Sequence, residues 1–345
     1  MSMTNDEMLA KLDSAVKNII DESTLDKSIL VAQQFDRFVR AMQKRSVILP
    51  EARFVEMDSH RMNIDRVGFV GRILKSGGAV TDGDQAHREL ESGDFAKPQF
   101  DTNELVAREV QAVASIRDRA LRRNIEREDF ENTLVDMIGE AAGRDLEEYA
   151  ILADLDIDHG DDDVLSLTNG WAKNAANKVY GEESTEDADD ADFDKDADDW
   201  PENVLQAMLD ALPKEFLQDR SEWRFYVPFE VEDAYRNLLK ARGTQLGDMA
   251  QTEDGNFMYK GIPVVYAPLI ERAKDYDADK NFPGRICMLQ HPDNMVWGVF
   301  HEVTMEPERY AKGRRTDFVL TVEADAHYED ENAAVVAFLD KPKPE

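Results

Sequence analysis

Two apolar segments in the last quarter of the chain place the strongest limit on its fold. Residues 286–289 and 295–300 are apolar throughout, and a Pro-Asp-Asn turn at 292–294 separates them. Unbroken apolar runs of this length, bounded by turn residues, are typical of strands that are buried on both faces. A third run, Gly261 to Tyr266, precedes them and is punctuated by glycine and proline. We therefore expect buried strands here, with the two runs that flank the turn lying next to each other in one sheet.

The closing segment has the clearest strand pattern. Between residues 318 and 329, apolar and polar positions alternate with period two, and a turn at 330–332 leads into a second apolar run at 333–339. Such alternation predicts a long hairpin with one buried and one solvated face. The residues expected on the buried face are Phe318, Leu320, Val322, Ala324, Ala326 and Tyr328; those expected on the solvated face are Val319, Thr321, Glu323, Asp325, His327 and Glu329.

Helical spacing appears at several places before these strands. The longest pattern covers about residues 127–153, which corresponds to a rod on the order of 40 Å. Shorter helices are expected at about 200–212, where Pro201 occupies the first turn, and at 231–242, with an aromatic strand at 222–228 between them. This alternation of strand and helix predicts a mixed α/β domain around a central sheet.

The amino-terminal hundred residues contain no self-sufficient core pattern. Two amphipathic helices are expected, at 4–22 and from about residue 23, and neither can bury its apolar stripe alone. Residues 66–74 read as a strand weakened by glycine, residues 76–99 as an extended polar loop, and the chain from Val106 onward as a long returning strand. An ordinary mobile hairpin is the simpler interpretation of this loop.

The order of these elements resembles that of the major capsid proteins of tailed phages and archaeal tailed viruses, which share the Hong Kong 97 capsid fold. The resemblance rests on the run Gly261-Ile262-Pro263-Val264, the apolar strand at 285–290, the Asp293-Asn294 turn and the apolar strand at 295–300. It implies an α+β protein divided into an amino-terminal helical arm (1–57), an extended β-hairpin loop (58–100), a peripheral domain with a long spine helix and long β-strands (101–157), a mixed α/β axial domain (158–303) and closing strands of the peripheral domain (304–345).

The charge is extreme: 73 acidic and 41 basic residues give a formal net charge of −32. Acid is spread over the whole chain, which favours a surface adapted to high salt and hence a halophilic host, because concentrated salt screens such self-repulsion. The densest run, 182–199, reads as a solvated insertion in the axial domain. So acidic a chain is unsuited to sequence-specific DNA binding. It begins without a signal-peptide pattern and contains no apolar run long enough to span a membrane.

The sequence yields no catalytic or cofactor motif, and we expect no enzyme. Asp154, Asp156 and Asp158 are weak candidates for a loosely bound cation, although the run around them departs from the calcium-loop template at its glycine and at its twelfth position. The single cysteine, Cys287, is expected to be a buried apolar residue. Some relatives of the resembled family crosslink subunits through a loop lysine, and Lys75 and Lys97 lie in the corresponding loop, where solvated lysines are the simpler interpretation.

What the resemblance implies about function is assembly. The chain would form pentamers and hexamers of an icosahedral head shell that is built in the host cytoplasm and encloses double-stranded DNA. A portal protein and decoration, turret or scaffolding proteins would be its partners. An encapsulin-type compartment that encloses cargo enzymes is the alternative within the same fold. A salt-adapted soluble hydrolase is the alternative from a different class.

Overall fold

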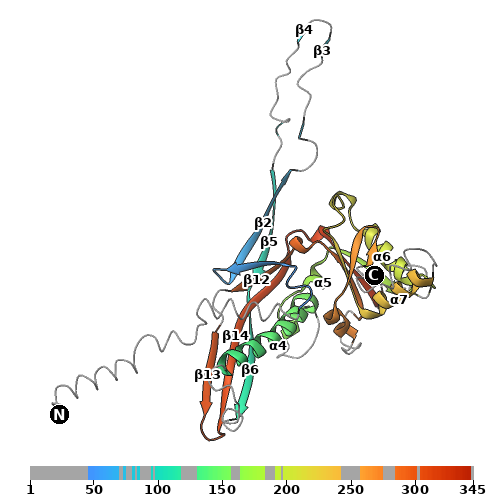
Figure 1. Cartoon of the computed structure of the whole chain (residues 1–345). Helices are drawn as coiled ribbons and strands as arrows, with labels where there is room; N and C mark the ends of the chain where they lie inside the picture. The colour runs from blue at the N-terminus through green and yellow to red at the C-terminus, as the bar shows by residue number, and fades with distance from the viewer. Residues whose placement is uncertain are drawn as a thin grey trace, which may run out of the picture.

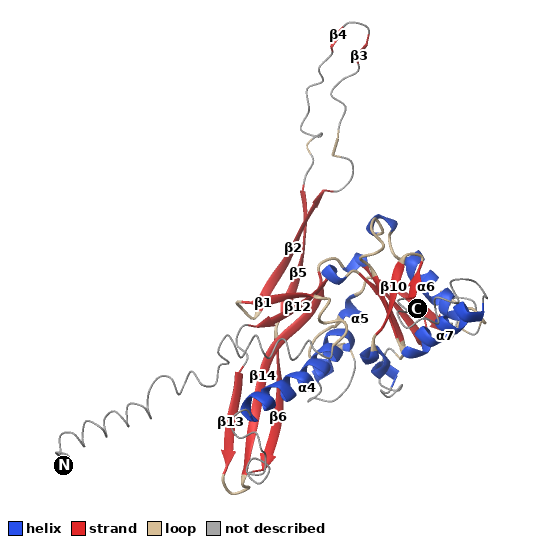
Figure 2. Ribbon diagram, viewed as in Figure 1, coloured by secondary structure: helices blue, strands red, loops and turns tan. Residues whose placement is uncertain are grey.

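The computed structural model describes residues 46–69, 73–74, 80–81, 84–85, 95, 98–117, 130–156, 164–182, 191–195, 197–241, 257–274, 284–300 and 304–342. These residues form two sheets that lie side by side, with a long hairpin projecting from the junction between them (Figure 1). Helices pack on both sheets, as expected for an α+β protein (Figure 2). The predicted helices at 4–22 and from residue 23 lie outside the described residues.

The first sheet, which we call the peripheral sheet, is built around β14 (Arg315–Tyr328). On one side β14 pairs antiparallel with β6 (Arg108–Arg117), and on the other with β13 (Thr304–Tyr310) and β12 (Met295–Phe300). A parallel edge strand, β1 (Arg53–Met57), completes the sheet beside β12. The alternation predicted for β14 is confirmed on its buried face, where these side chains are covered: Leu320, Val322, Ala324, Ala326 and Tyr328.

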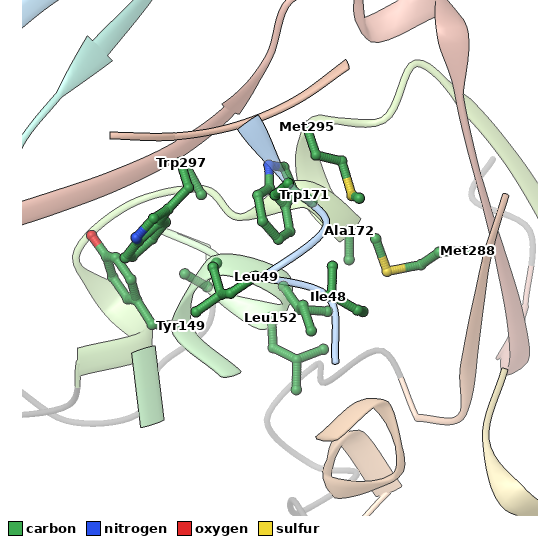
Figure 3. Packing of buried hydrophobic residues seen from close by; sticks show 14 of the residues in the cluster. Ile48, Leu49, Tyr149, Leu152, Trp171, Ala172, Met288, Met295 and Trp297 are labelled. Carbon is green, nitrogen blue, oxygen red and sulfur yellow. The ribbon is translucent and has the colours of Figure 1, made fainter. Parts of the chain in front are cut away.

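A long helix, α4 (Phe130–Leu152), packs against the peripheral sheet, close to the predicted 127–153. Its last two turns are buried together with the short helix α5 (Trp171–Asn174) and the turn η2 (Val164–Ser166). Gly170 lies so close to this helix that a Cβ added there would be 2.7 Å from the carbonyl oxygen of Ala150. Figure 3 shows the resulting cluster, in which Tyr149 and Trp297 meet edge to face.

The second sheet, which we call the axial sheet, has the strand order β7-β15-β11-β8-β10-β9. Helices α6 (Trp200–Ala211) and α7 (Phe229–Ala241) cover one of its faces. The strands are β7 (Asn177–Glu182), β8 (Arg224–Val227), β9 (Phe257–Tyr259), β10 (Ile262–Tyr266), β11 (Ile286–Gln290) and β15 (Ala334–Pro342).

Both faces of the axial sheet are buried, which explains its unbroken apolar runs. In β11, Cys287 and Leu289 pack in the core beneath α6 and α7, whereas Ile286 and Met288 pack in the core that the axial sheet shares with α4 and the peripheral sheet. Burial raises the pKa of the Cys287 thiol well above its usual value. The prediction that this cysteine is a buried apolar residue is confirmed.

Two predicted strand pairings are wrong. The runs on either side of residues 292–294 do not pair, because β11 belongs to the axial sheet and β12 to the peripheral sheet. In the same way, β14 and β15 form no hairpin: β15 pairs with β11 and β7. In the carboxyl-terminal half, the predicted domain ranges therefore differ from the sheets at two places, since 295–300 lies in the peripheral sheet and 334–342 in the axial sheet.

The two predicted pairings do not form because each short connection carries the chain from one sheet to the other. The turns η6 (Pro292–Asn294) and η7 (Glu331–Ala333) lie together at the junction. The buried amide of Asn294 donates from Nδ2 to the carbonyl oxygen of Asp330 at 2.9 Å and accepts from the Asp330 N–H at 2.8 Å. One side chain thus satisfies the backbone of the opposite crossover, a contact that no local turn pattern predicts.

The projecting hairpin pairs β2 (Arg61–Phe69) with β5 (Pro98–Val106) over nine residues, and β3 (Val80–Thr81) pairs with β4 (Asp84–Gln85) farther out. An outgoing and a returning strand are confirmed, but β2 begins five residues before the predicted Arg66, and β5 occupies part of the predicted loop. The returning strand is not one continuous strand, because it is interrupted at Ala107, between β5 and β6, and the buried positions change phase there. Leu105 and Ala107 are buried, whereas the outward Val113 is 64% exposed.

The predicted solvated insertion at 182–199 is wrong in its second half. Phe193 is buried in the core beneath α6 and α7. The backbone N–H of Asp192 donates to the Tyr180 carbonyl oxygen at 2.9 Å, and the Asp192 carboxylate accepts from the Tyr180 N–H at 3.0 Å. A single aromatic residue thus fastens the end of the acidic run to the edge strand β7; residues 183–190 lie outside the described part of the chain.

Candidate assembly surfaces

The two described candidates for cation binding are already paired with a lysine. Lys173 Nζ lies 3.0 Å from Asp154 Oδ1 and 2.6 Å from Asp156 Oδ2, so an ammonium group occupies the space between the carboxylates. Hydrogen bonding and charge from Lys173 lower the pKa of Asp156. Asp158 lies outside the described residues. Over the part of the chain that the structure describes, no three His, Cys, Asp or Glu side chains are grouped as metal ligands would be.

A pocket of about 210 Å³ lies between α4 and the strands β6 and β14. Its acidic lining residues are Asp145 and Glu148, and both face Arg272, whose guanidinium lies 3.9 Å from Asp145 and is hydrogen-bonded to Glu148. These carboxylates therefore act as partners of a structural ion pair. Nothing in this lining has the arrangement of a nucleophile with a base that a hydrolase requires.

None of the described helices is both long and apolar enough to cross a lipid bilayer.

The root of the hairpin is held by side chains as well as by the pairing of the adjoining strand β6 with β14. Asp325, on β14, accepts hydrogen bonds from the Val106 N–H at 2.7 Å and from the Thr168 hydroxyl at 2.9 Å. Asn103 on β5 donates to the Tyr328 carbonyl oxygen at 2.8 Å, and Arg66 on β2 forms an ion pair with Asp330. The root is therefore fixed to the crossover between the two sheets.

Asp325 was predicted on the solvated face of β14, and this is wrong: it is only 3% exposed. The root of the hairpin and the segment that carries Thr168 cover that face of the strand at this point. Burial raises the pKa of the Asp325 carboxyl, although its hydrogen bonds oppose the shift. Alternation along one strand cannot reveal a cover that comes from residues more than 150 positions away.

Beyond its root the hairpin leaves large apolar side chains uncovered. Val67 is 58% exposed, Leu74 80% and Phe95 63%. Figure 1 shows that the outer ends of β2 and β5 extend away from both sheets. Large apolar side chains left exposed on a projecting element are candidates for contact with another molecule.

The segment that follows the predicted arm enters the body of the molecule. Ile48 and Leu49 are completely buried against α4 and α5 (Figure 3). The buried Glu147 on α4 accepts from the N–H groups of Val47 at 3.3 Å and Leu49 at 3.4 Å. Burial raises the pKa of this carboxyl, against the effect of these hydrogen bonds. The predicted arm (1–57) is therefore too long, because residues 46–57 belong to the peripheral body.

The end of the axial sheet that carries the start of β11 combines an ion-pair network with exposed aromatic rings. Arg285 donates from Nε to Asp340 at 2.8 Å and from Nη1 to Glu230 at 2.8 Å. Partial burial acts to raise the pKa of Asp340, but the hydrogen bonds and charge of Arg285 together outweigh it and lower the pKa. Next to this network, Phe229 and Tyr266 pack edge to face with centroids 5.9 Å apart, and both are partly exposed.

Lys75 and Lys97, the crosslinking candidates, lie outside the described residues.

Comparisons with known proteins indicate which fold this arrangement belongs to. No family model matches the chain. It is 27% identical over 335 residues to "Putative prophage capsid protein YqbE" of Bacillus subtilis (strain 168), an alignment that covers 96% of this chain and 97% of that protein.

Solved structures that share the fold include a phage procapsid and an encapsulin complex. The satellite phage P4 procapsid including size determination (Sid) protein matches with a TM-score of 0.57 at 15% identity, covering 90% of this chain and 99% of that chain. The holo-SrpI encapsulin complex of Synechococcus elongatus PCC 7942 matches with a TM-score of 0.50 at 9% identity, covering 86% and 89%. The predicted fold is confirmed: the chain has the α+β fold of the Hong Kong 97-type capsid proteins.

Proposed function

We propose that this chain is the major capsid protein of a tailed phage. In this account it self-assembles into the icosahedral head shell of the virion, which encloses double-stranded DNA. The observation that carries the proposal is the projecting hairpin, whose exposed Val67, Leu74 and Phe95 are uncovered by the described residues of the same chain. The alignment with a protein named as a prophage capsid protein, over nearly the full length of both chains, supports it.

The mechanism is the summation of weak contacts. Axial sheets would gather around the five-fold and six-fold positions of the shell, and each hairpin would lie across a neighbouring copy and cover its own apolar side chains there. Many such contacts per copy make a closed shell stable even when a single contact is weak.

The shell would enclose DNA without recognising its sequence. A net charge of −32 gives little attraction for DNA, so the genome would be enclosed rather than condensed by the shell. A portal protein, with decoration, turret or scaffolding proteins, would complete the head, and assembly would take place in the host cytoplasm.

Electron microscopy of the purified full-length chain tests the proposal. We expect uniform shells tens of nanometres wide, which sediment far ahead of the 39.2 kDa subunit. A chain that stays monomeric at every concentration and salt condition would contradict the proposal and favour the alternative of a salt-adapted hydrolase.

An encapsulin-type compartment is the second candidate, because an encapsulin shares the fold. The contents of shells purified from the native source separate the two functions. Double-stranded DNA and a portal at one vertex would support the phage head, whereas a single enclosed enzyme would support the compartment.

The proposal that the host is halophilic rests on composition alone. At −32, like charges repel within and between copies, and concentrated salt weakens this repulsion. We expect the melting temperature of the unassembled chain to rise as potassium chloride increases from about 0.1 M to 1 M, over which the Debye length falls from about 10 Å to 3 Å. A flat or falling curve would remove the argument for salt adaptation.

A further inference from the structure

The turn between β13 and β14 reverses the charge of the rest of the chain. Residues 309–315 contain four basic residues and no acidic one, in a chain with 41 basic and 73 acidic residues among 345. At the average frequency, seven residues would hold about one basic side chain. Directly across the sheet, Arg117 at the end of β6 is the partner of Arg315. We call Arg309, Lys312, Arg314, Arg315 and Arg117 the basic tip.

The basic tip lies at the far end of the peripheral sheet. Figure 1 shows β6, β13 and β14 extending away from the axial sheet and ending together, on the opposite side from the projecting hairpin. Every residue from 308 to 315 is exposed. The charges are thus presented at an extremity, where they can meet another molecule without any movement of the fold.

The turn itself is closely built. The Tyr310 ring covers Gly313, where an added Cβ would lie 2.5 Å from the ring, and the Arg315 guanidinium lies 5.2 Å from the centroid of the same ring. Arg315 also donates from Nε to Asp317 at 3.0 Å. Lys312 and Arg314 are different: within the part of the chain that the structure describes, neither has an ion-pair partner. Two cations at the apex are therefore available to a partner.

We infer that the basic tip binds an acidic surface of a second copy of this chain. The inference deepens the proposed function and rests on it. Copies that each carry −32 repel one another, so a shell of such copies needs places where opposite charges meet. Basic side chains are scarce, and the tip concentrates them beside an exposed tyrosine. Arginine and tyrosine are enriched where proteins bind proteins.

DNA is the less suitable partner. A duplex presents a continuous row of phosphates, and affinity for it grows with the number of phosphates that lysine and arginine neutralise. Here Glu308 and Asp317 stand on the strands beside the basic turn, and their carboxylates would repel the phosphates of a duplex. A second copy instead offers separate carboxylates, which two or three cations can match.

The first experiment identifies the partner group. A mixture of isotopically heavy and light full-length chains is assembled and treated with a zero-length carbodiimide, which joins an amine only to a carboxylate in direct contact. Mass spectrometry should then find Lys312 joined to an Asp or Glu of the other isotope. If Lys312 forms links only within its own chain, or none, the inference is wrong. The same crosslinking can be carried out on a concentrated chain that forms no shells. The absence of shells would then contradict the proposed function, whereas the crosslinks of Lys312 would still test the inference.

The second experiment measures the effect on assembly. The variant Lys312→Gln/Arg314→Gln is compared with Arg220→Gln/Lys240→Gln, which removes the same charge from exposed positions in the axial part of the chain. At low salt we expect the tip variant to need an about tenfold higher subunit concentration for half-maximal assembly, and the control variant about the wild-type concentration. The gap should narrow as salt increases. Equal assembly of the two variants would overturn the inference, provided both melt at the wild-type temperature.

A DNA-binding measurement tests nucleic acid as the alternative partner of the basic tip. In fluorescence anisotropy with a short labelled duplex, the unassembled wild type should bind the DNA no more tightly than the tip variant does. If the wild type binds the duplex through the tip, and assembly is indifferent to the tip variant, then nucleic acid is the partner and the inference is wrong.

Discussion

The mixed axial sheet and the antiparallel projecting hairpin are both built from strands, yet they are covered in opposite ways. Every residue of β11 is buried, with one face under α6 and α7 and the other against the core around α4. In the hairpin, Ile64 is buried near the root, whereas Val67 farther out is 58% exposed. The axial sheet obtains its stabilising contacts from its own chain. The outer hairpin has apolar side chains but obtains no such contacts from the described residues.

The difference indicates where stability and assembly reside. Burying an aliphatic or aromatic side chain contributes about 1.5–3 kcal/mol, so the axial sheet and its two helices should fold without help from other copies. A two-stranded ribbon alone is only marginally stable in water. Under the proposed function, a second copy would therefore supply the contacts that stabilise the hairpin.

Deleting residues 76–97 from the hairpin should have the largest effect, and only on assembly. The contacts to neighbouring copies would be lost, while the cores of both sheets would remain complete. We expect a folded subunit with an unchanged melting temperature and no closed shells by electron microscopy. Normal shells from this variant would show that the hairpin is an ordinary surface loop.

Phe225→Ala should have the opposite effect. Phe225 is completely buried in the central strand β8, and its ring meets that of Tyr259 edge to face. Removing a buried phenylalanine costs about 3–5 kcal/mol, so we expect a corresponding loss in the free energy of unfolding, measured with urea on unassembled subunits. A loss below about 1 kcal/mol would mean that the axial core is loosely packed. Phe229→Ala, at a 51% exposed position, is the control and should change little.

Asp325→Asn should have an intermediate effect with a characteristic pH dependence. An amide can accept through only one of its two end atoms, so a donor now served by Asp325 Oδ1 or Oδ2 loses its partner, at a cost of about 1–3 kcal/mol. Because burial raises the folded-state pKa of Asp325, the wild type loses stability as pH rises from about 4 through that value, whereas the asparagine variant has no such titration.

The stability advantage of the wild type over Asp325→Asn should therefore shrink as pH increases. Urea unfolding at several pH values measures it, with exposed Asp58→Asn as the control. An advantage that grows with pH would mean that the hydrogen bonds outweigh burial and that the carboxylate is stabilised in the folded state.

Val67→Ser together with Leu74→Ser should have the smallest effect on the subunit. Both side chains are more than half exposed, so the free energy of unfolding should change by less than about 0.5 kcal/mol. Assembly should nevertheless need a higher subunit concentration, because these side chains would be covered only in the shell. A large loss of subunit stability would place the two residues in an internal contact instead.

The sequence predicted well wherever one element determines its own pattern. The helices α4, α6 and α7 and the buried face of β14 follow from periodicity, and proline at the first turn marks the start of α6. The order of elements was sufficient to indicate the fold.

Prediction failed where a distant segment decides the outcome. The turns at 292–294 and 330–332 look like hairpin turns, but Asn294 joins them to each other, and both carry the chain between sheets. Asp325 alternates as a solvent-facing residue should, yet the hairpin root covers it. Phe193 is one aromatic residue within an acidic run, too weak a signal to predict a buried anchor.

Hydrogen exchange of backbone amides, compared between unassembled subunits and shells, tests the central claim most directly. We predict that amides of β8 and β11 are equally protected in both states, and that assembly strongly slows exchange in the outer part of the hairpin, at residues 67–69 and 99–100. Equal protection of the hairpin in both states would contradict the account, because it would mean that the single chain already supplies the contacts we assign to its neighbours.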